Sequence, residues 1–439
     1  EVPWFAQFAE QNNCKWQQLS FGPSFGVSRT DTGEIYLWGS TSKKGERQYA
    51  PPRQLLLKDE TETRFKDVQC SESSVWGLTP TGTVIVWEMV PQMINELLAG
   101  PPMPRFCVGG RRLAGMKRPV KQMSVGVMHA AFLTEDGQVY CLGRNTYGQC
   151  GLDPSAQNIA SSCRRVSFPK HCHPVLRVEC GKSHTVAVGA EGQCLSWGDD
   201  SKIQLGLGDT RSSVGEERPW SGSRGFLNMR NTGEAMAAAP AFRGDGSGSR
   251  VASTSQRNYK DFESHQQNKP VTMMDIPLES DRQVHGIPYP PPSDVKCGDD
   301  FTLVLVRDSP DWYPPEEESQ RLFCCGENGK GQCGRSMQQQ QQIFAACRLP
   351  KNSKIQGFSC GSDHCLAVLR RVGVKKQELW CWGSNAFGQA GGNKNGAVCP
   401  AARLRLPKGT RVEAAWCGFT SSGVICSDIL RAEAAEVTP

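Results

Sequence analysis

The apolar residues of this chain fall in short stretches, and each stretch follows the same phrase. The phrase is a hydrophobic residue, a variable residue, a small residue, Gly, and a His or aromatic residue three positions later. Its clearest copies are Val178-x-Cys180-Gly181-x-x-His184 and Phe358-x-Cys360-Gly361-x-x-His364. Further copies surround Gly126 and Gly298, and weaker ones surround Gly22, Ser71 and Gly418. The apolar stretch that follows each phrase, such as 185–188 or 365–368, predicts a β-strand.

The seven units continue with the signals of more short strands. A turn glycine follows the apolar stretch in four units, at positions 33, 82, 137 and 192. The next predicted strand ends in an aromatic or apolar residue plus Gly, as in Trp38-Gly39, Trp197-Gly198 and Trp382-Gly383. A Gly-Gln phrase then closes the unit at 148–151, 331–334 and 388–391. The slot of the phrase glycine recurs every 49 to 63 residues, with one longer interval of 117.

A repeat of this length with about four short strands predicts the blade of a β-propeller. One four-stranded antiparallel sheet cannot bury both of its faces, so such sheets stack around an axis and fill the gaps with apolar side chains. Seven units therefore predict an all-β, seven-bladed β-propeller of four-stranded antiparallel blades, with a long irregular insertion. Glycine is expected where strands turn near the shaft, because a Cβ would clash there or φ must be positive.

The phrases resemble those of the regulator of chromosome condensation repeat family, whose units combine Cys-Gly-x-x-His, Trp-Gly and Asn-x-x-Gly-Gln-Leu-Gly. The segments 143–149 and 382–389 match the last two elements closely, and the resemblance covers 16–209 and 291–427. It implies a seven-bladed propeller in a divergent member with large insertions. Fold alone does not imply function, because propellers host unrelated activities. The family closes its ring with a strand from the other terminus, so residues 1–12 are expected beside the C-terminal strands, with a loose N-terminal arm as the alternative.

The long interval divides the chain into three predicted parts. Residues 1–209 are expected to form blades one to four, with the N-terminal strand closing the ring, and residues 291–439 to form blades five to seven. Residues 210–290 are a polar, basic insertion rich in Ser, Gly, Arg and Asn. Such a composition favours disorder. We expect partners in an assembly to hold this insertion in place; the alternative is that it folds back over its own propeller.

The composition predicts an intracellular compartment and no segment that spans a membrane. No run of about 18 apolar residues occurs in the 439, so no segment is expected to cross a bilayer. Eleven of the 20 cysteines occupy repeat slots that require a small apolar side chain, which predicts reduced, buried cysteines and an intracellular, reducing compartment. Because the sequence begins at Glu1 rather than Met, a cleaved leader and the mitochondrial matrix are favoured over the nucleus or cytoplasm.

Two groups of candidate residues follow. The first is a set of basic residues suited to contacts with RNA or an acidic partner: Arg105, Arg111, Arg112, Lys117, Arg118, Lys121, Arg218, Arg224, Arg230, Arg243, Arg250 and Arg257. A further basic group runs through the late repeats, between 348 and 411. The second is a set whose repetition indicates a structural role: His129, His184, His364, Trp38, Trp197, Trp382, Gly181, Gly298 and Gly361.

The sequence predicts a binding surface rather than an enzyme. It holds no Ser/His/Asp arrangement, paired carboxylate motif or phosphate-binding Gly loop. The cysteines and histidines between 163 and 180 lack the spacing of a compact zinc module, so no metal or cofactor is expected. Three functions remain: a scaffold in a large multi-protein or ribonucleoprotein complex such as a mitochondrial ribosome, a guanine-nucleotide exchange factor for a small GTPase, and a chromatin-binding protein. No exchange-factor wedge is identifiable, so no exchange residue is assigned.

Overall fold

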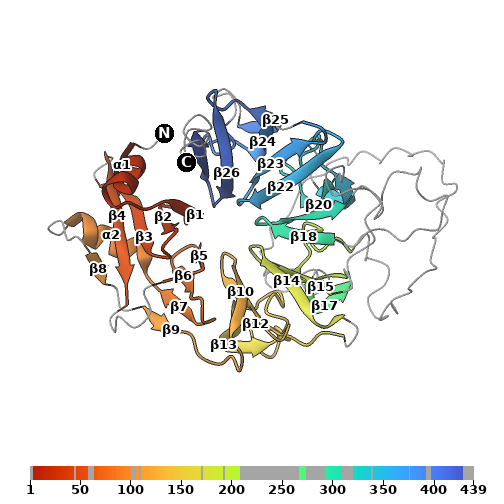
Figure 1. The fold of residues 1–439 in the computed structure, drawn as a ribbon. Helices are drawn as coiled ribbons and strands as arrows, with labels where there is room; N and C mark the ends of the chain where they lie inside the picture. Colours follow the sequence, from red (N-terminus) through yellow and green to blue (C-terminus); the bar gives the residue numbers. More distant parts are fainter. Residues whose placement is uncertain are drawn as a thin grey trace, which may run out of the picture.

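The structure is a computed structural model in which the strands form a ring of radial sheets around a central channel (Figure 1). It describes residues 3–43, 46–57, 64–99, 105–107, 110–169, 172–190, 193–207, 266–272, 292–307, 320–337, 340–374, 376–391 and 397–428. Within these residues there are six sheets of four or five strands and a seventh sheet of two strands, so the predicted β-propeller fold is confirmed, while the seventh blade has only two described strands. None of the described helices is long and apolar enough to cross a membrane.

The first three blades come from the N-terminal part of the chain. Blade one holds β1 (Trp16–Phe21), β2 (Phe25–Thr30), β3 (Ile35–Lys43), β4 (Glu46–Leu56) and β8 (Arg105–Cys107). Blade two holds β5 (Asp67–Cys70), β6 (Val75–Leu78), β7 (Val84–Trp87) and β9 (Arg111–Arg112). Blade three holds β10 (Val120–Val125), β11 (His129–Thr134), β12 (Val139–Arg144) and β13 (Ile159–Arg165).

The remaining blades follow the same order from the shaft outward. Blade four holds β14 (Val175–Cys180), β15 (His184–Gly189), β16 (Cys194–Asp199) and β17 (Gln266–Thr272). Blade five holds β18 (Pro292–Cys297), β19 (Phe301–Arg307), β20 (Gln320–Glu327) and β21 (Gln340–Ala346). Blade six holds β22 (Ser353–Cys360), β23 (His364–Arg371), β24 (Gln377–Ser384) and β25 (Val398–Leu404). Blade seven holds β26 (Thr410–Cys417) and β27 (Ser422–Asp428).

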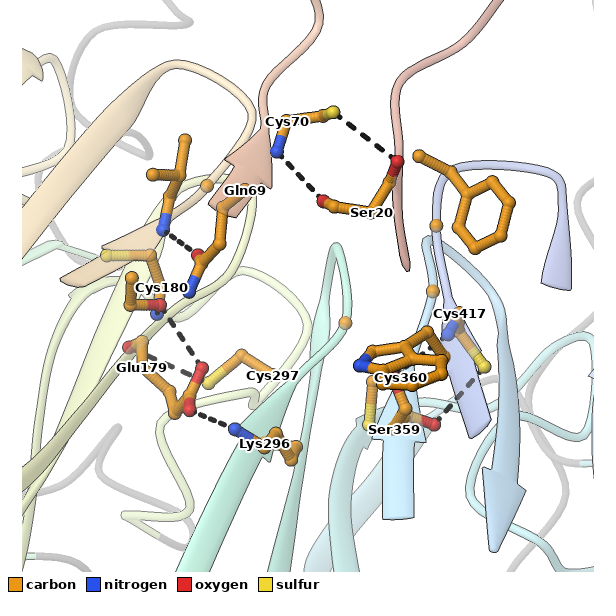
Figure 2. A pocket seen from close by; sticks show the side chains of 18 of the residues that line it. Ser20, Gln69, Cys70, Glu179, Cys180, Lys296, Cys297, Ser359, Cys360 and Cys417 are labelled. Atoms are coloured by element: carbon orange, nitrogen blue, oxygen red, sulfur yellow. Dashed lines mark hydrogen bonds and ion pairs between the residues drawn. The ribbon is translucent and has the colours of Figure 1, made fainter. Parts of the chain in front are cut away.

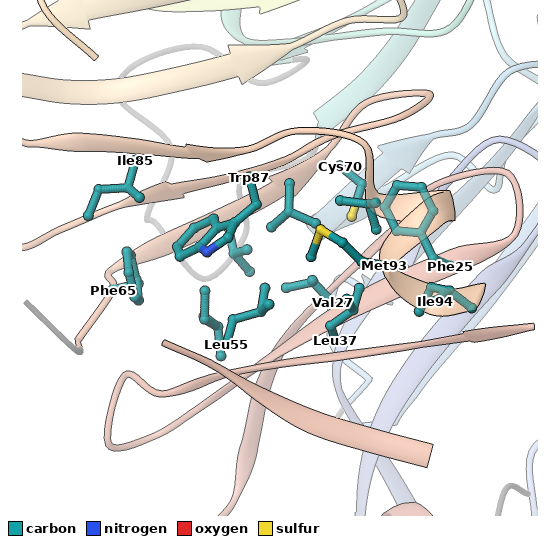
Figure 3. Close-up of a cluster of buried hydrophobic side chains, with 14 of the residues drawn as sticks. Phe25, Val27, Leu37, Leu55, Phe65, Cys70, Ile85, Trp87, Met93 and Ile94 are labelled. Atoms are coloured by element: carbon teal, nitrogen blue, oxygen red, sulfur yellow. The ribbon is translucent and has the colours of Figure 1, made fainter. Parts of the chain in front are cut away.

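The hydrophobic core is divided among the gaps between neighbouring blades, as the repeat predicts. In the gap between blades one and two, Val27 and Leu37 face Val68, Ile85 and Trp87 (Figure 3). Similar clusters fill the later gaps. The inner strand β1 contacts β26 and β27, so blade seven lies against blade one and the ring is closed by packing.

Two expectations are corrected by the structure. Blade four does not end before the insertion, because its outer strand β17 lies at 266–272 and pairs with β16. Most of the predicted insertion therefore lies in the sequence between the third strand of this blade, β16, and its fourth strand, β17. Residues 3–11 form a helix, α1 (Pro3–Gln11), rather than a strand beside the C-terminal strands. A second helix, α2 (Val90–Ala99), lies in the enlarged second unit, and the fold is otherwise all-β as predicted.

Aromatic contacts explain why the N-terminal segment is helical and lies on blade one. Phe5 meets the rings of Trp16 and Trp38 edge-on, at 5.3 and 5.4 Å between centroids. Phe8 stacks on Trp16 and meets Tyr36 edge-on at 4.9 Å. Phe5 and Phe8 are three residues apart and share one face of a helix. This segment therefore packs on blade one as a helix with an aromatic face, not as the closing strand that the resemblance implied.

Candidate interaction surfaces around the central channel

The shaft of the propeller is a channel of about 400 Å³ lined by the inner strands of all seven blades. The residue before the small residue of each phrase contributes to its wall: Ser20, Gln69, Ser124, Glu179, Lys296, Ser359 and Trp416. Figure 2 shows that Glu179 and Lys296 point toward each other across neighbouring blades, and they form an ion pair. Burial raises the pKa of Glu179, and the ammonium group of Lys296 opposes that shift.

Side chains of this wall join each blade to the next. The hydroxyl oxygens of Ser20, Ser124 and Ser359 accept the backbone N–H of Cys70, Cys180 and Cys417 at 2.9, 2.8 and 2.9 Å. The amides of Gln18 and Gln122 each bond the backbone N–H and the carbonyl of one residue in the next blade, Val68 and Val178. Many of the polar side chains in the channel wall therefore form hydrogen bonds to the next blade, and these bonds hold the inner strands together.

The repeated histidines join blades at one end of the channel. The Nε2 atoms of His129, His184 and His364 lie 2.8, 3.1 and 2.8 Å from hydroxyl oxygens of the following blade, those of Thr185, Thr302 and Ser422. All three rings are buried. Burial lowers the pKa of His129 and His364 to about 4 and that of His184 to about 3, so the imidazoles are neutral at pH 7.

The repeated tryptophans bond the Gly-Gln phrase of the preceding blade. The indole N–H of Trp197 donates to the carbonyl of Gln149 at 3.0 Å, and that of Trp382 donates to the carbonyl of Gln332 at 2.8 Å. Trp38 differs, because its indole N–H donates to Ser28 of its own blade and its ring is covered by α1. Gly181, Gly298 and Gly361 lie where the inner strands end. All members of the repeat set except Trp38 therefore contact a neighbouring blade in this structure.

At blade six, the end of the ring at which the inner strands begin is strongly basic. In blade six, Arg370 and Arg371 end β23, and Arg403 lies near the end of β25. We call the following residues of blade six, its connections and the start of β26 the basic end: Lys351, Lys354, Arg370, Arg371, Lys376, Arg403, Arg405, Lys408 and Arg411. The acidic residues among them are Glu378, which pairs with Arg371 and Arg403, and Glu413, which pairs with Arg411.

Part of the first predicted basic set lies at the same end of the ring. Lys117, Arg118 and Lys121 are exposed at the start of β10. Arg111 and Arg112 are exposed on the outer strand β9, where Arg111 pairs with Glu88 at 2.7 Å. Arg105 begins β8 on blade one. Arg218, Arg224, Arg230, Arg243, Arg250 and Arg257 lie outside the described residues.

The opposite end of the ring carries acidic and apolar side chains that sequence reasoning missed. Asp299, Asp300 and Asp363 stand in the turns after the inner strands of blades five and six. Burial, with the neighbouring carboxylates, raises the pKa of Asp299 to about 6 and also raises that of Asp300. Phe387 is 78% exposed in the loop that closes blade six. We call this the acidic end. The described residues contain no group of three or more His, Cys, Asp or Glu side chains placed to hold a metal.

Asp200 stands at the acidic end in a slot where three other blades have asparagine. Its Oδ1 accepts the backbone N–H of Leu205 at 3.0 Å, as Asn145, Asn328 and Asn385 do in their own loops. The amide N–H groups of Asn145 and Asn328 also donate to backbone carbonyls. A carboxylate has no such donor, and burial raises the pKa of Asp200 to about 7.

We expect Asp200→Asn to raise the free energy of unfolding by about 2 kcal/mol at pH 8. Between pH 4 and 7 the unfolded chain has an ionised Asp200 while the folded chain holds the proton, so wild-type stability falls as the pH rises. The increase in the free energy of unfolding caused by Asp200→Asn should therefore be smaller at pH 5 than at pH 8. Denaturant titrations at both pH values measure it. Asp199→Asn is the control, because Asp199 accepts bonds from Ser201, and it should be destabilising.

The sequence comparisons agree with this geometry. Profiles of the Regulator of chromosome condensation (RCC1) repeat match residues 136–188 and 319–368, and a second such profile matches 120–149. The chain therefore contains RCC1 repeats within 120–188 and 319–368. It is 28% identical over 335 residues to the human probable E3 ubiquitin-protein ligase HERC3. This alignment covers 65% of this chain and 29% of HERC3. It is 25% identical over 272 residues to the Arabidopsis thaliana ultraviolet-B receptor UVR8, covering 62% of this chain and 54% of that protein.

Solved structures support the fold of this RCC1-repeat protein. Human WBSCR16 superposes with a TM-score of 0.61 and 18% identity, over 94% of this chain and 87% of that one. Yeast RCC1 (Prp20), solved bound to Kap60, superposes with a TM-score of 0.61 and 14% identity, over 98% of this chain and 85% of that one. At such identities the likeness shows the propeller fold alone. The RCC1-repeat protein spans less than two thirds of the length of HERC3 and of UVR8.

Proposed function

We propose that this RCC1-repeat protein is a non-enzymatic interaction scaffold, a subunit or assembly factor of a large multi-protein or ribonucleoprotein complex. The observation that carries the proposal is the separation of charge between the two ends of the ring. Cations from several strands of blade six, together with Lys117, Arg118 and Lys121 of blade three, share one end. The polar side chains of the shaft are largely bonded to neighbouring blades, which leaves the two ends for partners.

The basic end suits a polyanion such as RNA. Lysine and arginine side chains that neutralise phosphates release counterions, so affinity depends steeply on salt. Arg405 and Lys408 are exposed after β25, and Lys376 is exposed before β24. A rigid propeller holds these cations at fixed spacings. We place the complex in a reducing compartment, with the mitochondrial matrix favoured; fractionation of native cells and identification of stoichiometric partners tests that placement.

We expect the triple variant Lys376→Gln/Arg405→Gln/Lys408→Gln to bind single-stranded RNA about 10-fold or more weakly at about 0.1 M salt, and to lower the slope of log K against log salt by about 2. Fluorescence anisotropy with a labelled RNA measures both. The matched control is Arg144→Gln/Lys182→Gln/Lys330→Gln, which removes the same charge from the acidic end. Equal weakening by both triples, or RNA binding by neither wild type nor control, contradicts a ribonucleoprotein role for the basic end.

A second function, guanine-nucleotide exchange on a small GTPase, is favoured by the acidic end. Acidic loops can disturb the phosphate and Mg²⁺ site of a GTPase, and exchange requires only that the nucleotide-free state be bound better. Asp300 and Asp363 stand in such loops, and the exposed Phe387 lies in a loop at the same end of the ring. Prp20p from Saccharomyces cerevisiae, which shares the propeller fold, has binding properties to Gsp1p and histones. Accelerated nucleotide release from a loaded GTPase, lost in Asp300→Asn/Asp363→Asn but kept in the basic-end triple, would favour this function over the scaffold.

A further inference from the structure

Two cysteine thiols of blade five lie closer together than an ordinary packing contact. Cys324 on β20 and Cys333, in the loop that follows β20, are both fully buried, and their Sγ atoms are 2.7 Å apart. Non-bonded heavy atoms pack at about 3.5 to 4.0 Å. Two other thiol pairs keep such a separation, namely Cys381 with Cys399 at 3.7 Å and Cys360 with Cys365 at 3.9 Å. The sulfurs of Cys324 and Cys333 are thus already placed to bond to each other.

The same two slots, one on the third strand and one in the loop after it, are filled differently in other blades. In blade four the hydroxyl of Ser196 donates to the carbonyl of Leu205 at 2.8 Å, so a polar bond joins strand and loop. In blade six the loop slot holds Ala390. In blade three the slots hold Cys141 and Cys150, and the Cys150 thiol donates to backbone carbonyls. A link between the slots therefore fits the fold, and in blade five the linking atoms are two sulfurs.

We propose that Cys324 and Cys333 form a reversible oxidation site, a dithiol that a hydroperoxide converts to a disulfide. A zinc site would need about four ligands, and among the described residues no group of three or more suitable side chains is placed to hold a metal. Two thiols in contact need only a two-electron oxidant. In a reducing compartment the dithiol is the resting form.

The position of each thiol decides which one reacts first. Cys333 lies in a loop at the acidic end, where Lys330 is exposed, so local opening of this loop brings Cys333 to the solvent. Cys324 lies on β20 between β19 and β21, and burial raises its pKa, so it stays a thiol until the loop closes again. Oxidation therefore begins at Cys333, and Cys324 completes it.

The two steps conserve atoms and electrons. The thiolate of Cys333 attacks one oxygen of the hydroperoxide, the O–O bond breaks, and Cys333 becomes a sulfenic acid. The alkoxide or hydroxide that leaves takes up the proton released by Cys333. The sulfur of Cys324 then attacks that of Cys333; the S–S bond forms as the S–O bond breaks, and the leaving hydroxide takes the proton of the Cys324 thiol to give water. A dithiol reductant reverses the reaction by exchange.

The bond would restrain a loop that contacts blade six. The carbonyl of Gln332, next to Cys333, accepts the indole N–H of Trp382 at 2.8 Å. Lys330 of the same loop pairs with Asp363 at 2.5 Å. A covalent link at Cys333 limits the opening of this loop and with it the separation of these groups. Oxidation thus stiffens the junction between blades five and six at the acidic end.

The test uses the full chain, reduced with a dithiol, freed of it and treated with hydrogen peroxide. Remaining thiols are blocked with N-ethylmaleimide before peptide mapping by mass spectrometry. We expect the peptides of Cys324 and Cys333 to become linked with loss of two hydrogen atoms, and to separate again on reduction. The link should form about 10-fold faster or more than one between Cys141 and Cys150, because its sulfurs start in contact. Hydrogen exchange at the Gly331 amide should slow about 10-fold in the oxidised chain.

Cys333→Ala removes one thiol and places in this slot the residue that blade six has there, Ala390. Peroxide should then leave the exchange of the Gly331 amide unchanged. The matched control is Cys150→Ala, which empties the same slot of blade three and should keep both the link and the slower exchange of the wild type.

The thiol of Cys426 is exposed, so its oxidation shows that the peroxide dose was sufficient. The proposal is overturned if Cys426 is oxidised while Cys324 and Cys333 stay unlinked, or if their link forms no faster than that in blade three. It is also overturned if Cys347 is the partner of either thiol, or if Cys333→Ala retains the slower exchange after peroxide.

Discussion

Gly361→Ala is expected to lower the free energy of unfolding by about 3 kcal/mol or more. A Cβ at this position would lie 2.2 Å from the carbonyl oxygen of Gly418 in blade seven and 2.3 Å from Cε1 of His364. The first atom is backbone of the neighbouring blade, and the second belongs to a ring held by Ser422. Neither can move without separating the blades at the shaft.

The same close approach recurs around the ring, so the effect is a property of the repeat. A Cβ on Gly126 would lie 2.3 Å from the carbonyl oxygen of Gly181, and one on Gly181 would lie 2.6 Å from that of Gly298. Glycine is required here by the distance between blades, not by a positive φ. Gly357→Ala on the same strand as Gly361 is the control, because a Cβ at position 357 would have no atom within 4 Å. Denaturant unfolding should show a change within about 0.5 kcal/mol. Similar losses for both variants would refute the explanation.

The sequence predicted the propeller because its repeated residues act between blades. The three histidines, two of the tryptophans and several phrase glycines contact the neighbouring unit, so the same residue type is needed in several copies. A requirement that recurs around a ring appears in the sequence as a period. The seven copies of the phrase therefore predicted seven sheets, even where the copy was as weak as that around Ser71.

Features that occur once have no period, and these were missed. β17 lies in a polar segment, yet it completes blade four because the edge of β16 requires a partner strand. The segment that forms α1 was assigned to a strand because the family closes its ring with a strand from the other terminus, whereas Phe5 and Phe8 pack as a helix face. α2 had a readable signal, since Val90, Met93 and Ile94 follow helical spacing and are buried.

The candidate surfaces were only partly predictable for a related reason. Basic residues of the late repeats are separated in sequence, and their common position depends on strand direction: Lys354 lies opposite Arg370 and Arg370 opposite Gln377. Once four antiparallel strands per blade are assumed, that grouping can be derived. The acidic end was overlooked because Asp299, Asp300 and Asp363 stand within the repeat phrase, where residues were interpreted as structural.

We expect the fold to lose stability in mild acid because of the three histidines between blades. Burial lowers the pKa of His129 and His364 to about 4 and of His184 to about 3, whereas in the unfolded chain the value is about 6.5. Below pH 6.5 the three imidazoles bind protons in the unfolded state but stay neutral in the folded state, so the free energy of unfolding falls as the pH falls. Each histidine contributes about 1.4 kcal/mol per pH unit, which gives about 4 to 6 kcal/mol in total between pH 7.5 and 5.

The buried carboxyls act in the opposite direction, so the histidine effect must be isolated. The pKa of Asp200 and that of Asp299 are raised by burial, and these groups add stability as the pH falls. The informative comparison is therefore between the wild type and His129→Gln/His184→Gln/His364→Gln. A glutamine amide reaches the position of Nε2 and does not titrate. Denaturant midpoints at pH 7.5 and 5 should show that the acid loss shrinks by about 4 kcal/mol in the triple variant. An unchanged difference would mean that the rings are protonated in the folded chain, with Thr185, Thr302 and Ser422 accepting from imidazolium groups rather than from neutral rings.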